Sequence, residues 1–368
     1  MSAFNPSDRD RELMQRALEL AARGLYTTTP NPRVGCVVAR DGRVIGEGWH
    51  ERAGEAHAEV RALADVAARG ETARGATAYV TLEPCNHRGR TPPCTDALLA
   101  AGVARVVTAM PDPFPPAAGG VARLSAAGVK VDTGLLGAEA RELNPGWIKR
   151  HIEGRPWVRV KVAASLDGRT ALESGESQWI TGEDARADGH HWRARACAIL
   201  TGIGTVQQDD PQLTVRAVET TRQPLKIVID RRGELPPKAR LLSSGPVIVF
   251  SAEPPQATWP SHVESLVIRG PDGKVDLARM LALLAEREIN EIHVEAGARL
   301  NGALLAAGLV DELLLYLAPC LIGDPARGMF ELPAPLARLA DRTALSIASI
   351  ERVGTDWRVL ARLAKQER

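Results

Sequence analysis

The sequence contains no long apolar run and no tract of low complexity. The apolar stretch from Leu309 to Ile322 is interrupted by Asp311 and Glu312, so it is a poor candidate for a membrane span. The first ten residues have neither the basic segment nor the apolar segment of a signal peptide. We therefore predict a cytoplasmic protein with no membrane partner.

A surplus of charge is also absent. The 46 Lys and Arg residues are balanced by 45 Asp and Glu residues, which leaves a formal net charge of +1. Proteins that bind nucleic acid usually carry a basic surplus or a basic stripe, because they must neutralise phosphates. The composition therefore favours small substrates, and we expect no nucleic-acid partner.

Cysteine is scarce, with five residues in a chain of 368. A cytoplasmic chain of this size does not need a disulfide framework, so a cysteine that acts with a nearby histidine is better explained as a metal ligand. We expect Cys36, Cys197 and Cys320 to lie in the core or to have no function.

A chain of 368 residues is too long for one ordinary core, so we predict two domains. Breaks at Asn144-Pro145-Gly146 and Gly154-Arg155-Pro156 place the boundary near residues 146–155, with domains at 1–147 and 155–368. In the first domain a helix that Asp8 or Asp10 could cap precedes alternating strands and helices. The second repeats this alternation, so both are α/β domains with mainly parallel sheets.

The strongest chemical signal is His57-Ala58-Glu59, followed by Pro84-Cys85 and Pro93-Cys94. One imidazole and two thiolates make a tetrahedral zinc site with an open fourth position, which is typical of a catalytic site. Zinc lowers the pKa of a bound water, and Glu59 can accept that proton and deliver it to a departing amine. The order of these residues matches the signature of the zinc nucleobase deaminases.

Each of these residues also has an ordinary explanation. His57 could be a surface histidine, Cys85 and Cys94 could be buried thiols, and Glu59 could be a solvated helix residue. Eight residues separate the two cysteines, whereas the general deaminase signature has two. The joint occurrence of the histidine, the glutamate and two Pro-Cys junctions favours the zinc site.

Several motifs resemble those of the bifunctional deaminase–reductases of riboflavin biosynthesis, almost from end to end of the chain. The eight-residue gap between the cysteines is this family's own spacing. The motifs that carry the resemblance are Thr29-Pro30-Asn31-Pro32-Arg33-Val34-Gly35, His57-Ala58-Glu59-Val60, Thr81-Leu82-Glu83-Pro84-Cys85, Gly89-Arg90-Thr91-Pro92-Pro93-Cys94, Ala164-Ser165-Leu166-Asp167-Gly168-Arg169, Ser174 to Thr181, Asp209-Asp210-Pro211, Leu213-Thr214-Val215-Arg216 and Val294-Glu295-Ala296-Gly297.

The resemblance implies a cytidine-deaminase-like α/β/α domain followed by a dihydrofolate-reductase-like α/β domain. It also implies two steps on one pyrimidine ribotide, 2,5-diamino-6-ribosylamino-4(3H)-pyrimidinone 5′-phosphate. The first step is a zinc-dependent deamination, and the second is an NADPH-dependent reduction of the ribosyl group to ribityl. We expect a homo-oligomer that binds Zn²⁺ and NADPH.

By matched position, the resemblance also assigns site residues beyond the catalytic Glu59 and the zinc ligands. The NADPH site would contain Ala163, Trp179, Thr205, Asp209, Gly297, Ala298, Arg299, Leu300, Asn301, Gly302 and Ala303. The substrates would contact Asn31 and His50 in the deaminase and Ser177, Arg193, Leu213, Arg216 and Glu295 in the reductase. Arg193 and Arg216 have the forked donors that suit a phosphate, although either arginine could instead form an ordinary ion pair.

The residues of the second half are less specific when taken without the resemblance. The glycines that follow Glu295 at the start of a helix would let a phosphate approach backbone N–H groups, but a plain strand–helix turn explains them as well. Trp179 could be a core aromatic residue. Arg231 stands where related chains often carry Ser, and it could bind the 2′-phosphate of NADPH or simply be solvated.

One loop departs from the family pattern. An Asn usually follows the Asp-Pro dipeptide of this loop, and here Phe114 follows Asp112-Pro113. The next Gly-x-Gly is shortened to Gly119-Gly120. The departure affects the substrate contacts expected from this loop and leaves the zinc ligands intact.

Two alternatives belong to other classes of protein. The chain could be a nucleic-acid base deaminase with a C-terminal binding module, but its charge balance does not favour this. It could also be a non-catalytic, zinc-stabilised regulatory protein, but a structural zinc site has no need of Glu59.

Overall fold

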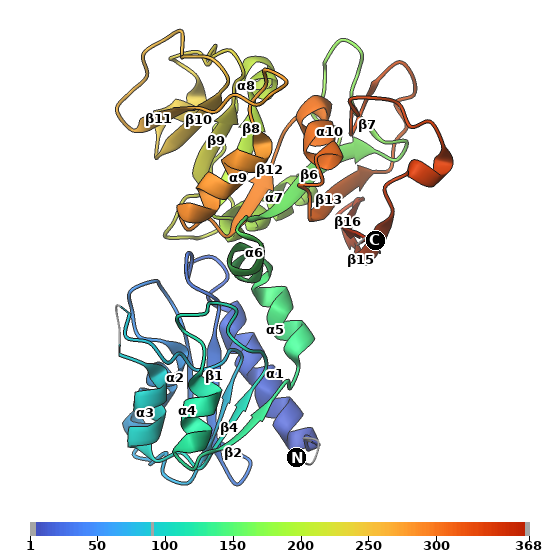
Figure 1. Ribbon diagram of the computed structural model, residues 1–368. Helices are drawn as coiled ribbons and strands as arrows, with labels where there is room; N and C mark the ends of the chain where they lie inside the picture. Colours follow the sequence, from blue (N-terminus) through green and yellow to red (C-terminus); the bar gives the residue numbers. More distant parts are fainter. Residues whose placement is uncertain (1–4, 90–91, 365–368) are drawn as a thin grey trace. The chain divides into compact units, whose positions relative to one another are not determined.

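The computed structural model describes residues 5–89 and 92–364, so Arg90 and Thr91 of the cysteine motif lie outside the described residues. The chain forms two compact units, residues 1–153 and 154–368 (Figure 1). Each unit has hydrophobic clusters of its own. No helix in the described part of the chain is long and apolar enough to cross a membrane.

The first unit is built on a five-stranded sheet of order β2-β1-β3-β4-β5. The strands β3, β4 and β5 are parallel, whereas β1 is antiparallel to both β2 and β3, so the sheet is less parallel than the sequence predicts. The elements are α1 (Asp8–Ala22), β1 (Gly35–Arg40), β2 (Arg43–Trp49), α2 (Ala58–Ala68), β3 (Thr77–Val80), α3 (Cys94–Ala101), β4 (Arg105–Thr108), α4 (Gly120–Ala126), β5 (Lys130–Thr133), α5 (Gly137–Leu143) and α6 (Pro145–Glu153).

Glycines allow α1 and α2 to pack closely on opposite faces of this sheet. A Cβ on Gly35 would lie 2.0 Å from the Ala17 carbonyl oxygen of α1, and a Cβ on Gly48 would lie 2.4 Å from the Ala62 nitrogen of α2. Gly48 pairs with Cys36, the neighbour of Gly35, and successive residues of a strand point to opposite faces. The two helices therefore enclose the sheet, as the predicted α/β/α layers require.

The start of α1 corrects one prediction. The N-cap is Ser7, whose side chain accepts a hydrogen bond from the Asp10 N–H, while the Asp10 carboxylate accepts one from the Ser7 N–H. This reciprocal arrangement satisfies two backbone donors that would otherwise lack partners. Asp10 therefore closes the cap from inside the helix and is not the N-cap itself.

The second unit is built on a nine-stranded sheet of order β11-β10-β9-β8-β12-β6-β13-β16-β15. The seven strands from β11 to β13 are parallel, and an antiparallel hairpin of β15 and β16 completes the other end. The elements are β6 (Trp157–Ser165), β7 (Arg169–Ala171), α7 (Glu183–Arg195), β8 (Ala198–Gly202), α8 (Ile203–Asp209), β9 (Leu225–Ile229), the 3-10 turn η1 (Arg240–Ser243), β10 (Val247–Ser251), β11 (Val263–Val267), α9 (Leu277–Glu286), β12 (Glu291–Val294), α10 (Ala298–Ala306), β13 (Glu312–Ala318), β14 (Arg327–Gly328), η2 (Leu339–Asp341), β15 (Leu345–Val353) and β16 (Asp356–Leu363).

The strand order places the predicted NADPH segments side by side. β8 leads into α8, which carries Thr205 and Asp209, and β12 leads into Gly297 and α10. Because β8 and β12 are neighbouring parallel strands, both connections leave the same carboxyl edge of the sheet. Ligands of open α/β sheets bind at this edge.

Candidate active sites

The three predicted zinc ligands meet in the first unit. His57 precedes α2, Cys85 lies in the loop after β3, and Cys94 begins α3. His57 Nδ1 lies 3.2 Å from Cys94 Sγ and 3.6 Å from Cys85 Sγ, and all three ligand atoms lie within 4.8 Å of one another. Tetrahedral zinc with ordinary Zn–N and Zn–S bonds separates its ligand atoms by roughly 3.5 Å. The three residues therefore fit a zinc ion.

Charge is distributed unevenly over these ligands. A hydrogen bond with Cys94 is the main cause that lowers the pKa of Cys85, to about 4, and a hydrogen bond with His57 acts in the same direction. Cys85 is therefore a thiolate at neutral pH, which is the form that binds metal.

Glu59 lies in the first turn of α2 and its side chain is buried. Burial raises the pKa of Glu59 to about 7, and the nearby Cys85 adds to this effect. The Glu59 carboxyl also forms a hydrogen bond with the Cys94 thiol. Glu59 is therefore at the site, with a pKa suited to proton transfer near neutral pH.

Asn31 and His50 form a pair beside the ligands. The Asn31 amide nitrogen lies 3.0 Å from His50 Nε2, and His50 Nδ1 lies 3.2 Å from the Ala56 carbonyl oxygen. Burial lowers the pKa of His50 to about 4, so the ring is neutral, with Nδ1 as donor and Nε2 as acceptor. The ring packs edge-on against His57, 5.2 Å between centroids.

The loop that departs from the family pattern also contributes to this site. The Phe114 side chain packs against the apolar cluster formed by Cys85, Cys94 and Ala117. The Glu83 carboxylate accepts hydrogen bonds from the Gly119 and Val121 N–H groups at 3.1 and 3.0 Å, which fixes the shortened glycine turn. An aromatic ring therefore stands where the family pattern has an amide.

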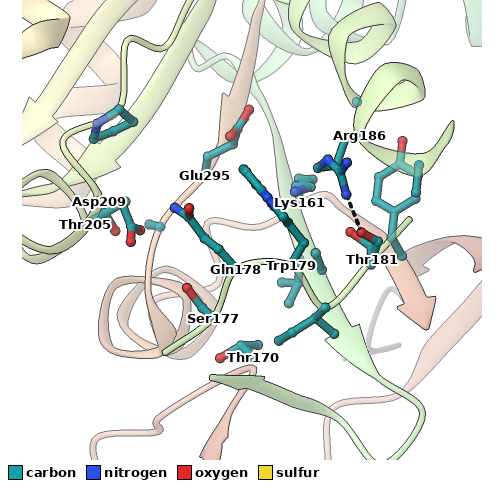
Figure 2. Close-up of a pocket in the computed structure, with 18 of the residues that line it drawn as sticks. Lys161, Thr170, Ser177, Gln178, Trp179, Thr181, Arg186, Thr205, Asp209 and Glu295 are labelled. Carbon is teal, nitrogen blue, oxygen red and sulfur yellow. Dashed lines mark hydrogen bonds between the residues drawn. The ribbon is translucent and has the colours of Figure 1, made fainter. Parts of the chain in front are cut away.

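The second unit contains a cavity of about 920 Å³. Figure 2 shows Thr205 and Asp209 on one side of it and Arg186 and Thr181 on the other. The cavity brings together most of the predicted reductase residues, namely Ala163, Ser177, Trp179, Arg193, Thr205, Asp209, Leu213, Arg216, Glu295, Gly297, Ala298 and Asn301.

Four residues of the predicted NADPH segment do not line this cavity: Arg299, Leu300, Gly302 and Ala303. A Cβ on Gly302 would lie 1.9 Å from the Glu331 carbonyl oxygen, so this glycine allows α10 to approach a neighbouring segment. Leu300 packs on the core, and Arg299 is exposed and pairs with Glu331. Within α10, the residues at the cavity are those of the first turn, Ala298 and Asn301.

Gly297 lies at a helix N-terminus that suits an anion such as a phosphate. It is the N-cap of the nine-residue helix α10, where backbone N–H groups and the helix dipole attract anions. A Cβ on Gly297 would meet no atom within 4 Å. The space in front of this backbone is therefore open to a ligand.

Arg193 and Glu295 form the polar centre of the cavity. Arg193 donates to both carboxylate oxygens of Glu295, at 2.5 and 2.7 Å, and to the Thr214 carbonyl oxygen at 3.0 Å. Burial alone would raise the pKa of Glu295, but the charge and hydrogen bonds of Arg193 hold this pKa well below its ordinary value. Glu295 is therefore a carboxylate at neutral pH.

The sequence analysis missed Lys161, which also lines the cavity (Figure 2). Burial lowers the pKa of its ammonium group, and the charge of Glu295 opposes this effect. A signal was present, because Lys161 interrupts the apolar residues Val160 and Val162 of a central strand. Lys161 is half-buried, and a lysine with a lowered pKa in a cleft is a candidate for proton transfer.

Two families describe the two halves of the chain. The cytidine and deoxycytidylate deaminase zinc-binding region matches residues 7–110, and the RibD C-terminal domain matches residues 156–359. The fold and the two sites thus define a bifunctional enzyme, a zinc-dependent deaminase followed by a reductase.

The whole chain is similar to known members of one family. It is 50% identical to the riboflavin biosynthesis protein RibD of Escherichia coli K12, over 94% of this chain and 97% of that protein. Its fold matches Acinetobacter baumannii RibD with a TM-score of 0.88 and 44% identity, over 97% of this chain and 99% of that one. A Thermotoga maritima diaminohydroxyphosphoribosylaminopyrimidine deaminase/5-amino-6-(5-phosphoribosylamino)uracil reductase gives a TM-score of 0.89 at 35% identity, with the same coverage.

The chain therefore belongs to the RibD family of riboflavin biosynthesis. This confirms the predicted family, its deaminase and reductase activities, both predicted folds and the cofactors zinc and NADPH. The alternative of a nucleic-acid base deaminase is not favoured.

Proposed function

We propose that this chain deaminates 2,5-diamino-6-ribosylamino-4(3H)-pyrimidinone 5′-phosphate and then reduces the ribosyl group of the product with NADPH. We assign the deamination to residues 1–147 and the reduction to residues 155–368. The observation that carries the proposal is the convergence of His57, Cys85 and Cys94 beside the buried Glu59, in a chain that also holds a reductase cavity.

In the deaminase site, Glu59 carries the proton. His57, Cys85 and Cys94 would hold a zinc ion, which would supply Lewis-acid activation of water. Glu59 would accept a proton from the attacking water and then donate it to the departing amine, so one carboxyl would serve as base and as acid. The neutral His50 orients the Asn31 amide, and we assign both residues to binding of the substrate.

In the reductase site, binding geometry provides most of the catalysis. NADPH would supply the hydride, and we assign its binding to the cavity residues Ala163, Trp179, Thr205, Asp209, Gly297, Ala298 and Asn301. Ser177, Leu213, Arg216 and Glu295 would bind the ribotide, with Arg193 holding the Glu295 carboxylate in place. A hydride donor and acceptor held in line need little further assistance.

Reduction of a ribosyl to a ribityl group also consumes a proton. The bond between C1′ and the ring oxygen breaks, C1′ accepts the hydride, and the ring oxygen accepts the proton. We assign this proton to Lys161, because burial lowers its pKa and it lies in the cavity with Glu295.

We also propose a cytoplasmic homo-oligomer whose partners are small molecules, with no nucleic-acid or membrane partner. The oligomer is supported by the outer strand β15, where Leu345, Ile347 and Ile350 are 44%, 59% and 54% exposed. Apolar residues along an edge strand mark a surface for pairing. The reduced thiols of the zinc site fit a reducing compartment. Light scattering of Ile347→Asp beside the wild type tests the oligomer, and an unchanged mass would contradict the role of this strand.

The experiment that tests the proposed function is incubation with the diaminopyrimidine ribotide, with and without NADPH. Mass spectrometry should show the deaminated ribotide in both samples and the ribityl product only with NADPH. An enzyme that deaminates single-stranded nucleic acid and leaves the ribotide unchanged would contradict the proposal.

A further inference from the structure

The sequence predicts that Arg193 and Arg216 suit a phosphate, but the ion pair of Arg193 with Glu295 leaves only Arg216 for this role. The guanidinium of Arg193 is neutralised by Glu295 through two hydrogen bonds. An arginine that already neutralises a carboxylate offers little net charge to a phosphate. Arg216 therefore lacks the second cation that a dianionic phosphate would need at this end of the cavity.

Among the described residues, no carboxylate forms a salt bridge with Arg216. Its Nη1 donates to the Gln212 side-chain oxygen at 3.2 Å and to the Thr214 hydroxyl at 3.0 Å, both neutral groups. Its backbone N–H donates to His190 Nδ1. Burial lowers the pKa of His190 to about 4, so this ring adds no positive charge at neutral pH. The neutral contacts fix the guanidinium and leave its charge for a ligand.

Arg240 is the second uncompensated guanidinium. It begins η1, between β9 and β10. The structure describes every residue between Ala217 and Glu295, and Arg240 is the only one of them that lines the cavity. Its backbone N–H donates to Asp210 Oδ1 at 2.7 Å, which ties the start of η1 to the turn before Pro211. Within residues 5–89 and 92–364, no carboxylate forms a salt bridge with Arg240 or with Arg216.

The two guanidinium groups act on each other electrostatically. Burial lowers the pKa of Arg216, the positive charges of Arg193 and Arg240 lower it further, and the charge of Glu295 opposes these effects. Arg216 and Arg240 line the same cavity, and like charges gathered there without salt bridges of their own disfavour the folded state, so an anionic ligand best explains the arrangement. Two forked guanidinium groups suit a phosphate, which offers several acceptor oxygens and two negative charges.

We propose that Arg240 is a specificity-determining residue of the reductase, which binds the 5′-phosphate of the ribotide together with Arg216. The inference rests on the proposed function. We favour the substrate over NADPH as the source of this phosphate. Arg193 contacts Glu295, which we assign to substrate binding, and also the Thr214 carbonyl oxygen, while the Thr214 hydroxyl contacts Arg216. Arg216 therefore lies at the end of the cavity assigned to the substrate. Arg240 would let the reductase distinguish a ribotide from the corresponding riboside.

The test compares Arg240→Ala with wild type on two ligands, the deaminated ribotide and the same riboside without its phosphate. Binding is followed by calorimetry in the absence of NADPH, and the affinity for NADPH is titrated separately. Loss of one charge-assisted contact should raise the Kd of the ribotide about ten- to hundred-fold. The Kd values of the riboside and of NADPH should stay at their wild-type levels.

Two further variants make the comparison specific. Lys238→Ala removes a positive charge from the same connection at a residue that does not line the cavity, and it should bind the ribotide normally. Arg240→Lys keeps the positive charge but lacks the forked donors of a guanidinium, so its Kd for the ribotide should lie between those of the wild type and Arg240→Ala.

The outcomes separate the inference from the function on which it rests. An equal loss of affinity for ribotide and riboside, or weaker binding of NADPH alone, would overturn the role of Arg240. Wild-type affinity of Arg240→Ala for the ribotide would overturn it as well, while the reductase assignment would stand. If the wild-type enzyme, supplied with NADPH in a separate assay, reduced neither ligand, this would instead contradict the proposed function.

Discussion

Arg193 and Glu295 lie 102 residues apart in the sequence and meet as a forked ion pair, with N–O distances of 2.5 and 2.7 Å. The side chains of both residues are 17% exposed, so each depends on the other for compensation of its charge. The first prediction follows from this dependence.

Arg193→Met should destabilise the second unit more than Glu295→Gln does. The first change leaves a partly buried carboxylate without its cation, at a cost of about 1–3 kcal/mol or more. The second also leaves a charge, that of Arg193, without its counter-ion, but the amide oxygen of Gln and the Thr214 carbonyl oxygen still accept hydrogen bonds from this guanidinium. Thermal unfolding of the two variants measures the difference. Equal unfolding temperatures would show that the pair is not mutually dependent.

Glu59→Gln should retain zinc and lose deamination by about a hundred- to ten-thousand-fold, because the amide cannot move the proton. Metal analysis and product formation from the diaminopyrimidine ribotide measure the two effects. Reduction of supplied deaminated ribotide serves as the control and should remain normal, since that chemistry belongs to the other unit. Near-normal deamination would remove Glu59 from its assigned role.

Cys94→Ser should lower both zinc content and deamination, because a hydroxyl is a much weaker zinc ligand than a thiolate. Cys320→Ser is the matched control, since Cys320 is exposed and does not belong to the ligand group. We expect about one zinc per chain in the wild type and in the control. Full zinc retention by Cys94→Ser would exclude Cys94 as a ligand.

Gly297→Val should weaken NADPH binding while deamination continues. The valine side chain would project into the open space in front of the α10 N-terminus, where the surrounding protein offers no clash that would prevent folding. Fluorescence titration with NADPH measures the effect. Gly204→Val is the control, because a Cβ on Gly204 also meets no atom within 4 Å and Gly204 does not line the cavity. Equal NADPH affinity in the two variants would refute the phosphate role of Gly297.

Asp10→Asn should destabilise the first unit at neutral pH by about 1–3 kcal/mol. Burial alone would raise the pKa of Asp10, but hydrogen bonds from Arg105, Tyr79 and Ser7 hold it well below its ordinary value. A carboxyl whose pKa is lower in the folded than in the unfolded state stabilises the fold above about pH 4. This stabilisation is lost as the pH falls from there toward the pKa of the folded state. Denaturant unfolding at pH 7 and pH 3 should therefore show a smaller difference between variant and wild type at the lower pH.

The zinc site was predictable because its chemistry is local. His57 lies at a helix start, Cys85 lies after a strand and Cys94 lies at a second helix start, and a proline directly precedes each of the two cysteines. The cavity residues near β8 and β12 were reachable only through the resemblance, since glycine-bearing strand ends alone are unspecific. The placement of His57, Cys85 and Cys94 within 4.8 Å is what the structure adds.

Which charged side chains form ion pairs with each other could not be predicted from the sequence. Sequence alone cannot tell that Glu295 neutralises Arg193, because this pair joins segments far apart in the chain. Nor can it tell that, within the described residues, the guanidinium of Arg240 forms no salt bridge while its backbone N–H donates to Asp210. The hairpin of β15 and β16 was missed for a different reason. Leu345, Ser346 and Ile347 alternate between apolar and polar, but a register shift between Ile347 and Ser349 interrupts the pattern, so the strand lacks the sustained alternation that reveals a half-buried strand.

The strands β9, β10 and β11 form the end of the large sheet beyond β8, and the connections that follow these three strands reach the cavity through Arg240 alone. The residues that we assign to the cofactor and the ribosyl group come from other segments. Evolution can therefore alter the connection between β9 and β10, and with it the anionic group that the enzyme accepts, without rebuilding the machinery of hydride transfer. A family with this layout can acquire new substrates by changing one surface turn.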